Sequence, residues 1–245
     1  MFTTRKRGFT LAELLITLAI IGIVATLTIP TLIQKYQERE TVLRVKEFYS
    51  MFSQAYQLAV LEHGTFDKWG LGDRKYTTDE DGTKYLTEDS LEGTNNFFKM
   101  LLPYLNFVSF VPKTKECELY TPEGNMSKFC KHGIVLANGT RIADVHYNTS
   151  NCINRNAYCG DFYITTDGKA MDETREDGKT YHTKKSFYFW IMQDRIILDT
   201  SDGSFKNQCL TGSNYTRCTY WVIKNGNMDY LHCKDLDLNT KTKCN

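Results

Sequence analysis

The stretch that decides the fold runs from residue 5 to residue 33 and reads RKRGFTLAELLITLAIIGIVATLTIPTLI. Three basic residues come first, and Glu13 is the only ionisable side chain between Phe9 and Ile33. About 20 apolar residues suffice to cross a bilayer as a helix. Because cytoplasmic flanks are enriched in Lys and Arg, the basic cluster predicts a cytoplasmic N-terminus with the rest of the chain on the opposite side of the membrane.

A secretory signal peptide also has basic residues followed by an apolar run. Two features of this sequence argue against that alternative. No A-x-A cleavage site follows the run, where the sequence reads Ala25-Thr26-Leu27. In addition, the carboxylate of Glu13 serves no purpose in a disposable signal. A charge within a membrane span costs about 3 kcal/mol on insertion scales and indicates a functional residue.

Residues 5–16, RKRGFTLAELLI, resemble the class III leader of type IV pilins and of type II secretion pseudopilins. The resemblance implies that a prepilin peptidase cuts after Gly8 and methylates the new N-terminal residue, Phe9. Glu13 corresponds to a hallmark glutamate of that family, and Pro30 is similar to a proline that many such subunits carry near the end of the apolar run. The likeness covers about residues 5–32, an eighth of the chain.

This resemblance implies a structural subunit, without enzymatic activity, of a type IV pilus or a type II secretion pseudopilus. Its partners would be other pilin or pseudopilin subunits, the prepilin peptidase, an inner-membrane assembly platform and the lipid bilayer. The subunit would cross the bacterial inner membrane once, with a periplasmic head, and would then enter a pilus or pseudopilus or reach the cell surface. The alternative is a periplasmic ligand-binding protein or enzyme that uses the helix only as a tether, which would need neither Glu13 nor the Gly8–Phe9 junction.

Phe9 and Glu13 are four residues apart and therefore lie on one helix face. Cleavage would give Phe9 a cationic amine, the natural partner of the Glu13 carboxylate. The pair could form within one helix, where it lowers the cost of insertion, or between neighbouring subunits, where it sets their axial register; we favour a role between subunits. Pro30 removes a backbone hydrogen bond, so a kink or a melted turn is expected there.

A single helix is predicted from about Phe9 to His63, roughly 80 Å long at 1.5 Å per residue. Its second half is amphipathic, because apolar residues recur at intervals of three or four; they are Val45, Tyr49, Phe52, Tyr56 and Ala59. Gly64 is a plausible C-cap. The predicted organisation is a leader at 1–8, a transmembrane or filament-core half-helix at 9–33, an amphipathic half-helix at 34–63 and a globular head at 64–245.

The head is expected to contain an antiparallel sheet of four or five strands. Asn138-Gly139 between the apolar runs 134–137 and 140–143 is a strong hairpin signal. Further strands are predicted at 161–166, 186–192 and 195–198. Residues 65–93 read as a long loop, the run 97–102 as a short helix that ends near Pro103 or Leu105, and 220–223 as a short helix or strand. The predicted fold class is α+β and pilin-like, with the long helix packed on a small sheet and a disulfide-rich C-terminal region.

None of the eight cysteines lies in the first 116 residues, and their number is even, which favours disulfides in an oxidising compartment. Zinc is the competing hypothesis, but no C-x-x-C spacing occurs. Short loops close at the least entropic cost. We therefore expect neighbours in sequence to pair, as Cys117–Cys130, Cys152–Cys159, Cys209–Cys218 and Cys233–Cys244.

Composition and motifs give few further indications of chemistry. Thirty basic residues balance 29 acidic ones, so nucleic acid is not indicated as a partner. We find no G-x-S-x-G, P-loop or H-E-x-x-H motif, and the five histidines have no ligand spacing. No catalytic, cofactor or metal site is predicted. Calcium binding is kept as a hypothesis for the acidic loops at 79–82, 167–168, 172–178 and 199–203, although none of these loops matches D-x-D-x-D-G.

Overall fold

A computed structural model describes residues 10–78, 80, 84–110, 133–169, 172–174 and 180–244. The chain divides into two compact units, Met1–Glu40 and Thr41–Asn245. Its first element is helix α1, Leu11–His63, which agrees closely with the expected long helix. The helix assignment is continuous through Pro30, so no melted turn occurs there, and the expected kink stays a prediction. Gly64 follows the helix with a φ of 81°, a conformation that suits a glycine cap.

In the second unit, α1 buries one face. The buried positions recur at intervals of three and four, as an amphipathic helix requires; they are Thr41, Val42, Val45, Phe48, Phe52, Ala55, Tyr56 and Ala59. Four of the five residues expected on this face are among them. The fifth, Tyr49, lies half-buried at the edge of the face and stacks on Phe189 with ring centroids 5.9 Å apart.

The central sheet has the strand order β10-β9-β6-β5-β4-β3, and every neighbouring pair is antiparallel. Its strands are β3 (Phe107–Phe110), β4 (Gly133–Leu136), β5 (Arg141–Tyr147), β6 (Tyr158–Thr165), β9 (Ser186–Met192) and β10 (Ile196–Ile197). The sheet therefore has six strands in the described part of the chain, one or two more than expected. The predicted hairpin at Asn138-Gly139 is confirmed as the β4–β5 turn, with Gly139 at a φ of 81°.

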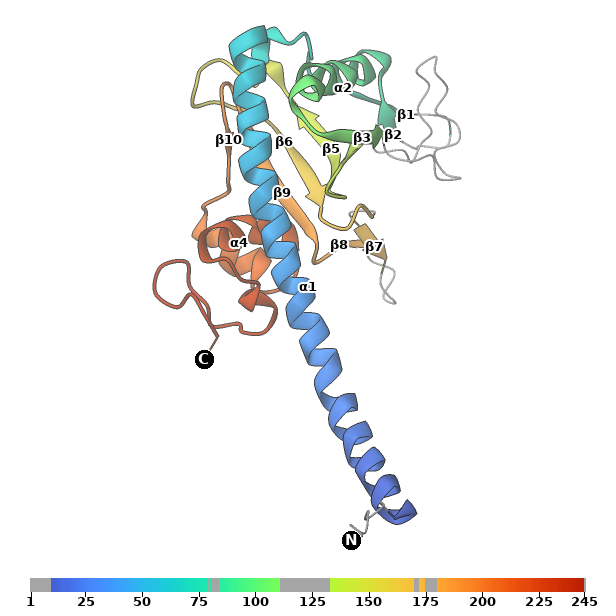
Figure 1. Cartoon of the computed structure of the whole chain (residues 1–245). Coiled ribbons are helices and arrows are strands. Elements are labelled where there is room, and N and C mark those ends of the chain that lie inside the picture. Colours follow the sequence, from blue (N-terminus) through green and yellow to red (C-terminus); the bar gives the residue numbers. More distant parts are fainter. Residues whose placement is uncertain are drawn as a thin grey trace. The chain divides into compact units, whose positions relative to one another are not determined.

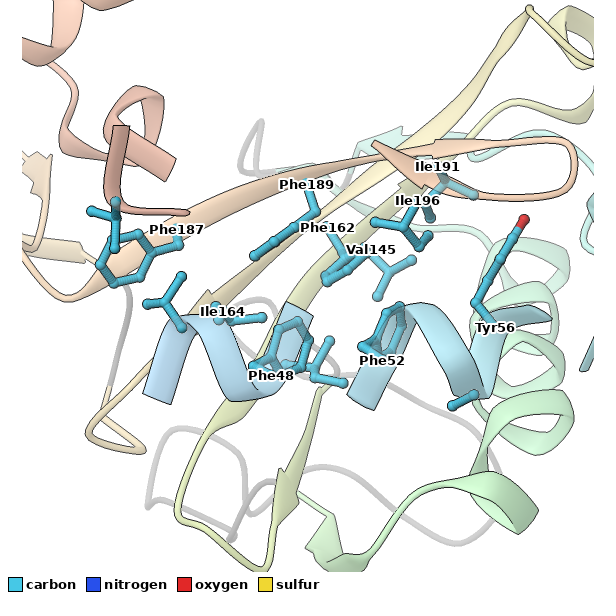
Figure 2. Close-up of a cluster of buried hydrophobic side chains, with 14 of the residues drawn as sticks. Phe48, Phe52, Tyr56, Val145, Phe162, Ile164, Phe187, Phe189, Ile191 and Ile196 are labelled. Carbon is cyan, nitrogen blue, oxygen red and sulfur yellow. The ribbon is translucent and has the colours of Figure 1, made fainter. Parts of the chain in front are cut away.

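The core forms where α1 crosses β6 and β9, as Figures 1 and 2 show. Phe52 stacks on Phe48 with ring centroids 5.1 Å apart and lies 4.7 Å from the ring of Phe162. Phe162 in turn stacks on Phe189 at 5.3 Å. These four side chains are at most 1% exposed. Burial of each phenyl ring stabilises the fold by about 1.5–3 kcal/mol, so this layer holds the helix on the sheet.

Tyr56 adds a directional contact to this layer. Its hydroxyl donates a 2.7 Å hydrogen bond to the carbonyl oxygen of Met192, at the end of β9. Burial, together with the nearby carboxylates of Asp194 and Asp67, raises the pKa of Tyr56 well above its usual value. The phenol therefore stays protonated and keeps its role as a donor.

The expectation of a loop over residues 65–93 is wrong. This region contains the short helix η1 (Phe66–Lys68), the paired strands β1 (Tyr76–Thr78) and β2 (Lys84–Leu86), and the first turns of α2 (Glu88–Leu101). The predicted short helix at 97–102 is only the end of α2. Thr87 caps the helix, because its hydroxyl oxygen accepts the backbone N–H of Ser90. The 3-10 helix η2 (Leu102–Tyr104) follows α2 and leads to β3.

Two smaller features complete the sheet region. The 3-10 helix η4 (Thr149–Asn151) follows β5, and a two-stranded antiparallel pair, β7 (Asp172–Thr174) with β8 (Thr180–His182), lies between β6 and β9 in sequence. The strand predicted at 195–198 is confirmed in part, as the two-residue strand β10.

The C-terminal region is compact and mostly helical. It contains α3 (Asp202–Ser204), η5 (Phe205–Cys209), η6 (Tyr215–Cys218), α4 (Thr219–Asn225) and η7 (Asp229–Leu231). The rings of Phe205 and Trp221 stack with centroids 4.8 Å apart. Helix, antiparallel sheet and a disulfide-rich C-terminal region are all present, so the expected pilin-like α+β fold class is confirmed.

Candidate functional site

The first candidate is the apolar first half of α1. Its large hydrophobic side chains from Leu11 to Ile33 are each at least half exposed. Soluble proteins rarely expose a contiguous apolar surface of this size, because burial of such a surface is favourable. Within the described residues, α1 is also the one helix long and apolar enough to cross a membrane. The segment is a membrane anchor whose exposed side chains suit a lipid or protein environment.

The hydroxyl groups in this segment are satisfied by the helix itself. Thr17, Thr26, Thr28 and Thr31 each donate to a backbone carbonyl oxygen three or four residues earlier, at 2.7–2.9 Å. Unpaired polar groups are costly in hydrocarbon, so such internal bonding suits a helix that leaves water. The carboxylate of Glu13 remains as the polar group of the segment that can act on a partner.

Glu13 is held at the start of α1 by Thr10. The Oε2 atom of Glu13 accepts hydrogen bonds from the backbone N–H and from the hydroxyl of Thr10, each at 2.8 Å. In return, the backbone N–H of Glu13 donates to Thr10 Oγ1 at 3.3 Å. This is a reciprocal capping box. Within the described residues, Oε1 of Glu13 accepts no hydrogen bond, so one carboxylate oxygen is left for another partner.

Thr10 is a site residue that the sequence reasoning above did not identify. Its signal was present, because Thr10-x-x-Glu13 before an apolar run is the sequence signature of a capping box. Gly8 and Phe9, the predicted cleavage and methylation residues, lie outside the described residues. Cleavage after Gly8 would leave the amide between Phe9 and Thr10 intact, so both Thr10 bonds to Glu13 can persist in a processed subunit.

Three of the four expected disulfides lie in the described part of the head. Cys152 pairs with Cys159, Cys209 with Cys218, and Cys233 with Cys244. These are the pairs that short-loop closure predicts. Cys117 and Cys130 lie outside the described residues. Two of the three bridges hold the C-terminal region, where the helices are short.

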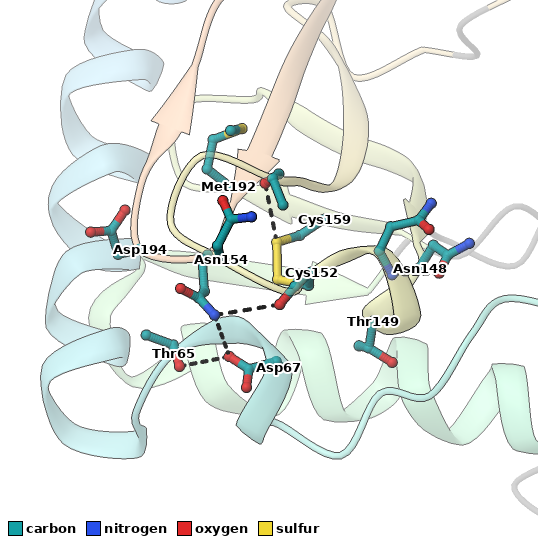
Figure 3. Close-up of a disulfide and its surroundings, with 12 residues drawn as sticks. Thr65, Asp67, Asn148, Thr149, Cys152, Asn154, Cys159, Met192 and Asp194 are labelled. Carbon is teal, nitrogen blue, oxygen red and sulfur yellow. Dashed lines mark hydrogen bonds between the residues drawn. A yellow bond between two sulfur atoms is a disulfide. The ribbon is translucent and has the colours of Figure 1, made fainter.

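The third bridge, Cys152–Cys159, fastens a loop beside the end of α1 (Figure 3). Gln193 links the neighbouring segments, since its Nε2 donates to the carbonyl oxygen of Cys152 at 3.4 Å and to Asp67 Oδ1 at 3.3 Å. Thr65 also donates to Asp67 Oδ1, at 2.6 Å. The network joins the loop after α1 to the β9–β10 turn.

Asp199 and Asp167, in two of the four acidic loops, are held by protein groups. No group of three or more His, Cys, Asp or Glu side chains among the described residues could hold a metal ion. Asp199 accepts the backbone N–H of Ser201 at 3.0 Å and pairs with Arg217 at 3.1 Å. Asp167 similarly accepts the N–H of Lys169 and lies 3.5 Å from the Lys185 ammonium. Calcium binding stays a prediction, since parts of the other two acidic loops lie outside the described residues.

Comparison with known proteins agrees with this picture of the N-terminus. The family model described as the prokaryotic N-terminal methylation motif matches residues 3–29, so the chain carries a prepilin signal of the type IV pilin and pseudopilin type. Neither the curated proteins nor the solved structures contain a significant match to the chain. A second model, described as a family of unknown function (DUF6613), matches residues 31–197. That match spans well over half of the sequence, and the chain belongs to this family.

Proposed function

We propose that this protein is a structural subunit of a type IV pilus-like or type II secretion pseudopilus filament. The observation that carries the proposal is the start of α1. There, a membrane-length apolar segment whose large side chains are at least half exposed begins with a prepilin signal and contains one carboxylate, Glu13, of which one oxygen accepts no hydrogen bond from the described residues. A membrane anchor alone requires the apolar segment but gains nothing from the carboxylate.

A physical argument indicates that the Glu13 carboxylate sets the register between neighbouring subunits during assembly. Lipid is as apolar as leucine or isoleucine, so hydrophobic contact alone cannot select a register between neighbouring helices. Processing after Gly8 would create an amine at Phe9, close to the membrane depth of Glu13. An incoming subunit whose Glu13 Oε1 is unpaired would be attracted to the amine of the subunit above. The charge pair would then set the stagger, while the apolar side chains supply most of the contact area.

The same proposal assigns location and partners. The N-terminus would lie in the cytoplasm and the head in the periplasm while the subunit is in the inner membrane. A prepilin peptidase would process it, and an assembly platform would extract it from the bilayer into a filament. The prepilin-type signal supports the assignment of a structural protein. The competing function, a tethered periplasmic binding protein, predicts a subunit that stays in the membrane.

The test is to express the full chain with and without a prepilin peptidase and an assembly platform. With both, mass spectrometry should find an N-terminal, N-methylated Phe9, and shearing should release filaments that contain the protein. Without the peptidase, the chain should keep its first eight residues and remain in the membrane. Cleavage near Thr28 would instead identify a secretory signal, and correct processing without any filament would favour the tether.

A further inference from the structure

The face of the central sheet that points away from α1 carries a cluster of aromatic and polar side chains. Strand register places His146, Asp161 and Trp190 in one row across β5, β6 and β9, and it places Tyr163 opposite Tyr188 in the next row. Side chains alternate between the two faces of a strand, and the residues between these positions point into the core. We name this set the outer aromatic patch; it comprises His146, Tyr158, Asp161, Tyr163, His182, Tyr188 and Trp190.

The rings of the patch contact one another across strands. Tyr163 lies 5.0 Å from Tyr188 and stacks on His182 at 5.6 Å, while Tyr158 meets Trp190 edge to face at 5.7 Å. Exposure rises along the patch, since Tyr188 is 6% exposed, Trp190 and Tyr163 are half-buried, and Tyr158 is 38% exposed. Cross-strand pairing of side chains explains the burial of Tyr188 at one end of the patch. Such pairing does not require the exposed ring of Tyr158 at the other end.

The C-terminal region covers only the buried end of the patch. Arg217 lies over the ring of Tyr188, 4.3 Å from its centroid, and the Thr219 hydroxyl oxygen accepts the backbone N–H of Tyr188 at 2.9 Å. These contacts fasten η6 and α4 to β9. The side chains of Tyr158 and Trp190 lie beyond them and keep part of their surface accessible.

Hydrogen-bonding groups lie among the accessible rings. Asp161 is buried; its Oδ1 lies 3.0 Å from His146 Nδ1, and its Oδ2 accepts the hydroxyl of Tyr158. A carboxylate has about four lone-pair sites, so acceptor capacity remains on both oxygens. The indole N–H of Trp190 is buried beside the Tyr188 side chain, so it does not face a ligand.

The charge of the patch restricts what can bind there. Arg217, the guanidinium nearest the rings, is already paired with Asp199 at 3.1 Å. The described patch therefore offers the carboxylate of Asp161 without an unpaired arginine or lysine beside it. Phosphate and sulfate groups are bound by arginine and lysine, so nucleic acids and acidic lipid headgroups fit poorly. A neutral ligand rich in hydroxyl groups fits both the rings and the polar atoms.

We propose that the outer aromatic patch binds a neutral polysaccharide. The apolar C–H faces of its sugar rings stack on Tyr158 and Trp190, and sugar hydroxyls donate to Asp161. Apolar surface with a few placed polar groups is the usual composition of a small-molecule site. The proposal concerns the head alone and holds whether the chain is a filament subunit or a tethered protein.

The experiment measures depletion of the purified full chain from solution by insoluble neutral polysaccharides, namely cellulose, chitin and starch. A polyoxyethylene detergent keeps the protein soluble, because a detergent with a sugar headgroup would compete. At least one polysaccharide should deplete the unmodified protein. Tyr158→Ala and Trp190→Ala should each weaken that binding about ten-fold, the equivalent of one aromatic contact. Tyr158→Phe, which keeps the ring and loses the bond to Asp161, should give an intermediate value.

Tyr76→Ala is the matched control, since Tyr76 is 51% exposed on β1 and lies outside the patch; it should bind as the unmodified protein does. Circular dichroism and intact disulfides establish that each variant is folded, and Tyr158→Ala removes an exposed ring that the core does not need. The proposal is overturned if none of the three polysaccharides depletes the protein. Equal binding by the folded Tyr158→Ala and Trp190→Ala variants, or binding only to a polyanion such as alginate, would overturn it as well.

Discussion

Replacing Glu13 with alanine tests the proposed function at the single ionisable side chain of the apolar segment. The change removes the acceptor of two 2.8 Å hydrogen bonds from Thr10. Loss of a cap costs a helix about 1 kcal/mol, which affects only its first turn. Alanine also relieves the insertion penalty of about 3 kcal/mol that a carboxylate carries in the bilayer. We therefore expect the variant to insert, to be cleaved and to fold its head normally.

Filament assembly should respond very differently to the same change. Removing one partner of a buried ion pair costs roughly 3–5 kcal/mol, because the other charge is left uncompensated. Since about 1.4 kcal/mol corresponds to a tenfold change, the equilibrium constant for adding a subunit should fall by roughly two to four orders of magnitude. Glu13→Gln should be intermediate, because an amide oxygen accepts a hydrogen bond but carries no charge.

The assay compares sheared filaments with membrane-bound subunit by immunoblot. Glu38→Ala serves as the matched control, because Glu38 lies on the same helix beyond the apolar run and accepts a 3.0 Å hydrogen bond from Gln34. That control should give a normal yield. A normal filament yield from Glu13→Ala would refute the reasoning, and the simple membrane tether would become the better account.

Three further predictions concern processing, redox state and the core. Gly8→Leu should block cleavage because a bulky side chain closes the peptidase site, and mass spectrometry should find the full-length chain; cleavage at an unchanged rate would contradict the prepilin assignment. The denatured, unreduced protein should show no free thiol on labelling, and loss of the Cys209–Cys218 bridge by double alanine substitution should lower the free energy of unfolding by about 2–4 kcal/mol. Phe52→Ala should lower it by about 3–5 kcal/mol in urea titrations followed by tryptophan fluorescence, whereas Leu58→Ala, at an exposed position on the same helix, should change it by less than about 0.5 kcal/mol. Equal effects from these two helix substitutions would show that α1 does not pack on the sheet through the face described.

Local signals were enough to predict α1 and the β4–β5 hairpin. The apolar run, the recurrence of buried residues after Thr41 and the glycine at residue 64 all act within a few residues of the backbone that they shape. Asn138-Gly139 likewise acts within its own turn. The prepilin signal is also local, since a peptidase recognises a short continuous stretch of residues. For the same reason Thr10 could have been identified from the sequence.

The beginning of α2 shows where such reasoning fails. The expectation of a loop over residues 65–93 rested on their polar composition, which is rich in Gly, Asp and Thr, and Gly93 is one of these poor helix formers. In the structure a Cβ atom at Gly93 would lie 2.2 Å from the carbonyl oxygen of Leu71 and 2.5 Å from the hydroxyl of Tyr147. Close packing against Leu71 and Tyr147, which are distant in sequence, therefore requires glycine at position 93. Local helix propensity, in contrast, disfavours glycine within a helix.

The sequence by itself determined the membrane anchor, its processing signal, the long helix and three cysteine pairs that close short loops. The tertiary structure alone decided that β3 completes the sheet, that α2 begins at Glu88, and that an aromatic patch gathers on the outer face. Pairing of strands and stacking of rings join residues far apart in the chain, such as Tyr163 and Tyr188. No short window of sequence contains both partners of such a contact, so only the folded chain reveals them.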